Sequence, residues 1–140
     1  MTPTLFGRWQ TRLLLLFTVG LFVTLPFAIG LIGPQPDPAY FLILGYVAIF
    51  GLFWDIVYDQ IQKYRWDRDW PAVYQLFAGI WEFIFIAFGI GIGFLPTLGG
   101  FNLFLSFFHY SVVWLAVFLT SQSIMRIIFV RWRFFGGQWL

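Results

Sequence analysis

Four apolar segments, each close to the length that a helix needs to cross a bilayer, constrain this chain more than any other feature. They cover about residues 13–32, 40–58, 74–95 and 102–130. About 20 apolar residues span the hydrocarbon core of a membrane. Helices are required there because backbone amides in lipid must be satisfied within their own segment. The sequence therefore predicts an all-α integral membrane protein, residues 1–140, with one domain of four transmembrane helices in two hairpins.

The composition agrees with lipid as the surrounding solvent. Hydrophobic residues make up 61% of the chain and charged residues only 10%, whereas soluble domains carry about 25% charged residues. The chain has no cysteine, which excludes disulfides, thiolate metal sites and thiol catalysis. The basic residues are too few for nucleic-acid binding.

The positions of the basic residues predict the orientation in the membrane. The connectors at about 33–38 and 96–100 contain no Lys or Arg. All eight basic residues precede the first segment, lie between the second and third, or end the fourth: Arg8, Arg12, Lys63, Arg65, Arg68, Arg126, Arg131 and Arg133. By the positive-inside rule, both termini and the charged connector at about 59–71 should be cytoplasmic.

Aromatic and basic residues gather at the same predicted boundary. One interpretation is interfacial anchoring, with Trp rings at the headgroup level and Arg heads on phosphate. The other is a docking surface for a partner, because contacts between proteins are rich in Trp, Tyr and Arg. The residues concerned are Tyr64, Arg65, Trp66, Arg68, Trp70, Arg131 and Trp132.

The third segment carries an acidic residue on a stripe of small ones. Gly79, Glu82, Gly89 and Gly93 recur at steps of three, four or seven residues. Glycines on one face let another helix backbone approach closely, so we expect these three to pack helices together. Glu82 then faces the bundle interior, about 12 Å from the inner boundary. An unpaired carboxylate there is unfavourable, so Glu82 should be paired, protonated or in contact with water.

Other polar residues should face the same interior. His109 lies on a polar stripe of the fourth segment, roughly 10 Å along the axis from Glu82, which permits a water link rather than a direct hydrogen bond. Asp55 and Arg126 are expected at similar depths near the cytoplasmic end. We therefore predict an Asp55–Arg126 ion pair.

Two weaker hypotheses concern ligands. His109 is either a packing histidine or the axial ligand of a haem or chlorin; apart from lipid, no other cofactor is expected. Asp55 and Asp59 share a helical face that is able to hold Mg²⁺. The second acidic motif that Mg²⁺-dependent membrane transferases normally need is missing from the sequence.

Three functions are compatible with these patterns. The first is a non-catalytic membrane subunit that acts by helix packing and partner contact, within a larger membrane complex or a homo-oligomer. The alternative is a small oligomeric transporter or channel that uses Glu82 and His109. The third is an enzyme acting on lipid or isoprenoid through Asp55 and Asp59. The absence of a recognisable catalytic set favours the first.

Overall fold

In the computed structural model the described residues, 3–97 and 102–138, form helices and no strand. Within them, four helical stretches are long and apolar enough to cross a membrane: Leu5–Ala28, Ala39–Lys63, Ala72–Gly91 and Leu103–Ile128. The predicted all-helical class with four candidate spans is confirmed.

The first span begins about eight residues earlier than predicted. It consists of α1 (Leu5–Leu15), a π-helical turn η1 (Leu16–Gly20) and α2 (Leu21–Ala28), which contains Pro26. The side chain of Thr4 caps α1 by accepting a hydrogen bond from the Gly7 amide. Arg8 and Arg12, which the sequence placed before the first span, therefore lie within this candidate span.

The second and third spans also differ from the predicted limits. Helix α3 (Ala39–Lys63) continues past residue 58, so the charged connector covers only residues 64–71, before α4 (Ala72–Gly91). Helix α4 ends before the predicted residue 95. Gly93 follows its end with φ of +78°, a left-handed conformation that glycine adopts readily. The prediction that Gly93 packs helices together is wrong, because Gly93 lies in the turn after α4.

The predicted fourth helix is broken. Helix α5 (Leu103–Gln122) starts at Asn102, whose side chain accepts from the Leu105 amide, and ends at Ser123. Two short helices follow, α6 (Ile124–Ile128) and α7 (Val130–Phe134). Residues 98–100 of the predicted turn at 96–100 lie outside the described part of the chain.

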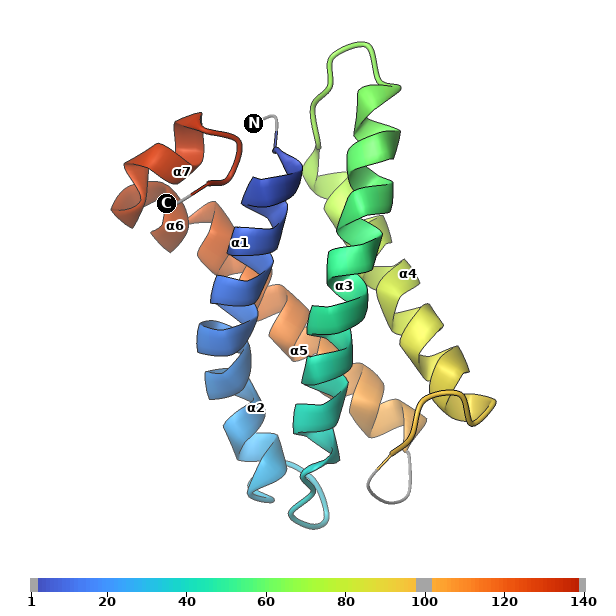
Figure 1. The fold of residues 1–140 in the computed structure, drawn as a ribbon. Coiled ribbons are helices and arrows are strands. Elements are labelled where there is room, and N and C mark those ends of the chain that lie inside the picture. The colour runs from blue at the N-terminus through green and yellow to red at the C-terminus, as the bar shows by residue number, and fades with distance from the viewer. Residues whose placement is uncertain (1–2, 98–101, 139–140) are drawn as a thin grey trace.

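The helices form a bundle in which α5 crosses behind the others (Figure 1). Helices α1 and α2 run beside α3, and α4 lies on the far side of α3. The connector and both chain ends lie at one end of the bundle. Hydrogen bonds connect the chain ends to each other and to α3: the Thr4 amide donates to the Gly136 carbonyl (2.8 Å), and Gln62 of α3 donates to the Pro3 carbonyl (3.1 Å).

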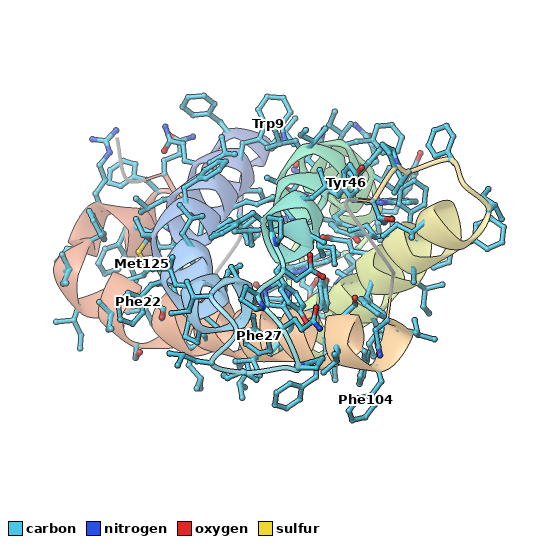
Figure 2. All side chains as sticks on the ribbon, turned by 90° about the horizontal axis from the view of Figure 1, so that it is seen from below. Trp9, Phe22, Phe27, Tyr46, Phe104 and Met125 are labelled. Carbon is cyan, nitrogen blue, oxygen red and sulfur yellow. The ribbon has the colours of Figure 1, made fainter. Side chains whose placement is uncertain are left out.

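Large apolar side chains point outward as well as inward. Phe27 is 1% exposed, but Phe22 is 77% and Phe104 75% exposed. In Figure 2, viewed from below the bundle, the Phe104 ring points away from the helices. Extensive exposed apolar surface is uncommon in soluble monomers, and a lipid environment accounts for it.

Candidate functional site: a buried charge cluster and an adjoining cavity

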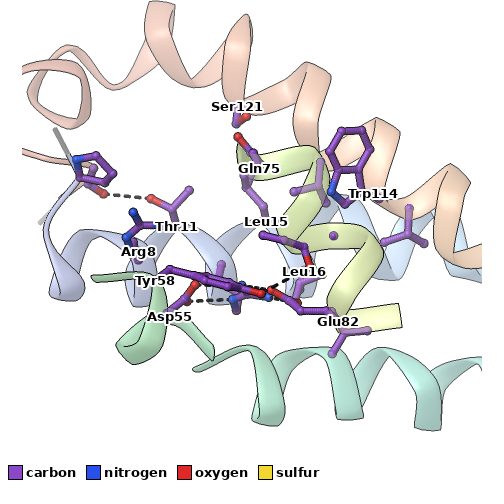
Figure 3. A pocket seen from close by; sticks show the side chains of 18 of the residues that line it. Arg8, Thr11, Leu15, Leu16, Asp55, Tyr58, Gln75, Glu82, Trp114 and Ser121 are labelled. Carbon is purple, nitrogen blue, oxygen red and sulfur yellow. Dashed lines mark hydrogen bonds and ion pairs between the residues drawn. The ribbon is translucent and has the colours of Figure 1, made fainter. Parts of the chain in front are cut away.

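Arg12 of α1 is the centre of a buried charge cluster. Its guanidinium donates to both carboxylate oxygens of Asp55, from Nε at 2.8 Å and from Nη2 at 2.9 Å. It also donates to both oxygens of Glu82, from Nη1 and Nη2, each at 2.9 Å. Figure 3 shows the Asp55 and Glu82 side chains, with dashed lines for the bonds between the residues drawn. We call Arg12, Asp55 and Glu82 the charge cluster.

Burial makes this pairing important for the fold. Asp55 is 3% exposed and Glu82 5%, and a lone charge at such a place in a membrane is unfavourable. Paired, hydrogen-bonded oxygens offset much of that penalty, and bidentate Arg–carboxylate pairs have the best geometry for it. Since the three residues come from α1, α3 and α4, the charge cluster ties three helices together.

The predicted Asp55–Arg126 pair is wrong. Arg126 is exposed in α6 and donates to Gln122 at 2.5 Å, because the break after α5 takes it away from Asp55. The sequence analysis missed Arg12, which it placed before the membrane. The Thr4 cap is the signal that identifies it: counted from Thr4, Arg12 lies about 12 Å into the helix, the depth expected for Glu82.

Gly51 of α3 makes room for the guanidinium. A Cβ added at Gly51 would lie 2.1 Å from Nη1 of Arg12 and 2.5 Å from its Cζ. Real Cβ atoms do not approach another heavy atom this closely. The sequence analysis did not single out Gly51, because its contact is with a side chain far away in the sequence.

The predicted packing glycines of α4 behave differently from each other. A Cβ at Gly79 would lie 2.3 Å from Nε1 of Trp114 in α5, and the Gly79 carbonyl accepts from Tyr110 at 2.8 Å. Gly79 thus allows α4 and α5 to meet. A Cβ at Gly89 would instead lie 2.8 Å from the side chain of Leu95, in the turn that follows α4.

His109 is 1% exposed and bonds to α2 rather than to Glu82. Its Nε2 lies 2.9 Å from the Thr24 hydroxyl, which donates its own hydrogen to the Gly20 carbonyl. Nε2 must therefore be the donor, and the unprotonated Nδ1 is buried without a partner. The ring centres of Phe27 and Tyr40 each lie 4.9 Å from that of the imidazole. His109 could therefore bind a haem or chlorin iron or magnesium only if these two rings moved away.

A cavity of about 200 Å³ adjoins the charge cluster. It lies between α1, α3, α4 and α5, and Figure 3 views it from close by. Its apolar lining comes from the junction of α1 and η1, from α3 and from α5: Leu15, Leu16, Ile43, Leu44, Val47, Val113, Trp114 and Val117. The lining includes Arg8, Thr11, Leu15, Gln75, Trp114 and Ser121.

The connector presents two aromatic side chains to the surroundings. Tyr64 is 90% exposed and Trp66 is 95% exposed. Between them Arg65 donates to Asp67 at 3.0 and 2.7 Å and to the Tyr74 hydroxyl at 2.7 Å. The bond from Arg65 holds the pKa of the Asp67 carboxyl below its ordinary value, so this pair stays charged at neutral pH.

Of the other connector residues predicted at this surface, Trp70 turns toward the bundle and Arg68 does not. Trp70 packs under Arg8, whose guanidinium carbon lies 4.4 Å from the ring centre. Arg68 adopts φ of +51°, and its carbonyl accepts from Gln62 at 2.8 Å. The side chain of Arg68 remains exposed.

At the C-terminal end, Trp132 is not an interfacial or partner contact. It is 3% exposed and donates to the Thr11 hydroxyl at 2.7 Å, and that hydroxyl donates to the Gly137 carbonyl at 2.9 Å. Sequence reasoning placed Trp132 at the membrane boundary because it assumed a straight fourth helix. Arg131 is exposed, with its guanidinium 4.7 Å from the Phe135 ring.

The two carboxylates of the weak Mg²⁺ hypothesis each have a cationic partner. Asp55 belongs to the charge cluster, and Asp59 pairs with Lys63 at 2.8 Å. Among the described residues, no group of three or more His, Cys, Asp or Glu side chains is placed to hold a metal ion. Comparison of the chain with protein-family models, curated proteins and solved structures finds no match.

Proposed function

We propose that this protein is a non-catalytic membrane component that acts by contact with other subunits, in a larger membrane complex or as a homo-oligomer. The observation that carries the proposal is the state of the buried carboxylates. In the described residues, both oxygens of Asp55 and both oxygens of Glu82 accept hydrogen bonds from Arg12, and Asp59 pairs with Lys63. The contacts of Asp55 and Glu82 with Arg12 join α1, α3 and α4, whereas the Asp59–Lys63 pair lies within α3. Carboxylates held in such pairs are not free for acid–base chemistry.

The same proposal places the connector and both chain ends in the cytoplasm. They share one end of the bundle (Figure 1), which also carries Lys63, Arg65, Arg131 and Arg133. A surplus of Lys and Arg is typical of the cytoplasmic side. A partner that contacts the connector would therefore be met at the cytoplasmic surface.

The contact surface that we assign to a partner consists of Tyr64 and Trp66. These two side chains are almost fully exposed, on a connector stiffened by the bonds of Arg65 to Asp67 and Tyr74. A rigid aromatic group loses little conformational entropy when a partner covers it, and Trp and Tyr are enriched among residues that dominate binding energy.

The alternative of a transporter or channel receives less support from the geometry. Glu82 is held by two hydrogen bonds from Arg12, and His109 is enclosed by aromatic rings. A proton carrier must also take up a proton in each cycle, and the ion pair between Glu82 and Arg12 opposes that uptake. The cavity beside Glu82 is the feature that favours this alternative. An enzyme acting through Asp55 and Asp59 has the least support.

We expect the double variant Tyr64→Ala, Trp66→Ala to separate from its partner. The wild-type protein, extracted from its own membrane in mild detergent, should have a native mass well above the 16.4 kDa of one chain. Truncating residues that dominate an interface costs about 2 kcal/mol or more each, so the variant should run as single chains. Native mass spectrometry measures both masses.

Phe104→Ala provides the matched control, since Phe104 is an exposed aromatic residue in the first turn of α5, and α5 begins at the end of the bundle away from the connector. It should leave the native mass unchanged. Wild-type protein that leaves its own membrane as single chains would refute the proposed function. If the double variant still forms the complex, Tyr64 and Trp66 of the connector are not part of the contact surface.

A further inference from the structure

Arg8 lies one helical turn before Arg12 in α1 but, unlike Arg12, has no ion pair with a described residue. Its Nη2 donates to the Gln62 side chain at 2.6 Å, and its guanidinium lies over the Trp70 ring. Its Nε is buried without a hydrogen-bond partner. No ion pair of Arg8 exists within residues 3–97 and 102–138. An amide and an aromatic ring do not neutralise the charge.

The carboxylates near Arg8 are already engaged. Asp55 and Asp59 lie close enough to act on Arg8 through space, but Asp55 is held by Arg12 and Asp59 by Lys63. A guanidinium with a buried donor and no counter-ion is unfavourable in a membrane protein. An anion that binds beside Arg8 would offset this charge.

The cavity gives such an anion a place to bind. Arg8, Thr11, Gln75 and Ser121 all line it. Arg8 lies about 6 Å from the Thr4 cap of α1, the level at which Arg and Trp side chains reach lipid headgroups. The anion would therefore lie at headgroup depth, where the Arg8 guanidinium and the Gln75 amide are the donors. The Thr11 and Ser121 hydroxyls already donate to the Gly137 and Phe118 carbonyls.

The deeper part of the cavity is apolar. Leu15 of α1 and Val113, Trp114 and Val117 of α5 line it. Helices α4 and α5 approach each other at Gly79 and Trp114, and Gln75 and Ser121 lie on the connector side of that contact. The cavity, about 200 Å³, is smaller than the roughly 300–1,000 Å³ of pockets for drug-sized ligands. It has room for part of a lipid, whose remainder would stay in the bilayer.

We infer that this cavity binds one anionic lipid, with the lipid phosphate on Arg8 and part of an acyl chain against Leu15, Val113 and Val117. A free phosphate ion would offset the charge of Arg8 but would leave the apolar part of the cavity unfilled. A zwitterionic lipid would fill the apolar part but adds a cation next to Arg8. An anionic phospholipid meets both requirements.

The test uses native mass spectrometry of the full chain in detergent, with dioleoylphosphatidylglycerol or dioleoylphosphatidylcholine added. We expect one phosphatidylglycerol per chain, bound at least about ten-fold more tightly than phosphatidylcholine, as for hydrogen bonds to charged groups. Arg8→Gln should abolish this preference, and Arg8→Lys should retain most of it. Arg131→Gln, an exposed arginine at the same end, should leave it unchanged.

Val117→Phe tests the apolar part without altering Arg8. The larger side chain fills the cavity and should weaken phosphatidylglycerol binding at least about ten-fold. The inference is overturned if the two lipids bind equally well to the wild type, or if folded Arg8→Gln or Val117→Phe binds phosphatidylglycerol as the wild type does. Displacement of phosphatidylglycerol by millimolar sodium phosphate would also overturn it, by identifying the ligand as a free anion.

Discussion

Replacing Arg12 with leucine should lower the free energy of unfolding by about 3–5 kcal/mol, the usual penalty for removing one partner of a buried ion pair. The change leaves the carboxylates of Asp55 and Glu82 buried without a cation. It also removes four hydrogen bonds that join α1 to α3 and α4. Reversible unfolding in mixed micelles, followed by tryptophan fluorescence, measures the loss.

Two further variants show whether the loss of stability comes from breaking the charge cluster or from replacing any arginine with leucine. Arg126→Leu removes an exposed arginine and should change the unfolding free energy by no more than about 0.5 kcal/mol. The triple variant Arg12→Leu, Asp55→Leu, Glu82→Leu should recover most of the lost stability, because well-packed apolar residues can replace a buried ion cluster. Equal losses for Arg12→Leu and Arg126→Leu would show that the cluster does not stabilise the bundle.

Gly51→Ala should have the second largest effect, a loss of about 1–3 kcal/mol typical of overpacking. The new Cβ would lie 2.1 Å from Nη1 of Arg12. The guanidinium is hydrogen-bonded to Asp55 and Glu82, so it cannot move away from the new Cβ without weakening those bonds. The same unfolding measurement detects the loss.

Gly45→Ala is the control on the same helix. Apart from the neighbouring backbone of its own helix, no atom of the described residues lies within 4 Å of the position of its new Cβ. Alanine also favours a helix over glycine by up to about 1 kcal/mol. Gly45→Ala should therefore be neutral or slightly stabilising. If the two alanine variants are equally stable, Arg12 does not lie against Gly51.

The parts of the fold that depend on local pattern are predictable from this sequence. Four apolar runs of the right length identify four spans because a helix in lipid must be long and continuous. The helical spacing of Glu82 relative to Gly79 also places Glu82 toward the interior, and the structure buries it. Periodicity shows which face of a helix is buried, but it does not show which residue lies opposite.

To predict the charge cluster, one must know which residues of different helices lie opposite each other. Arg12 precedes the apolar run, so a rule based on charge placed it outside the membrane, and Asp55 was matched with Arg126 by depth alone. The Trp132–Thr11 bond joins residues 121 positions apart, after a break at Ser123 that no proline or glycine marks. Contacts of this kind follow from the packed bundle and not from any one segment.

Proton movement across liposomes provides the most direct test of the central claim, that the buried charges hold helices together and do not carry protons. The purified wild-type protein and Glu82→Gln are reconstituted into separate pyranine-loaded liposomes, and a pH step is applied. Our account predicts that both acidify at the rate of protein-free liposomes. Faster acidification by the wild type that returns to the protein-free rate in Glu82→Gln would contradict it.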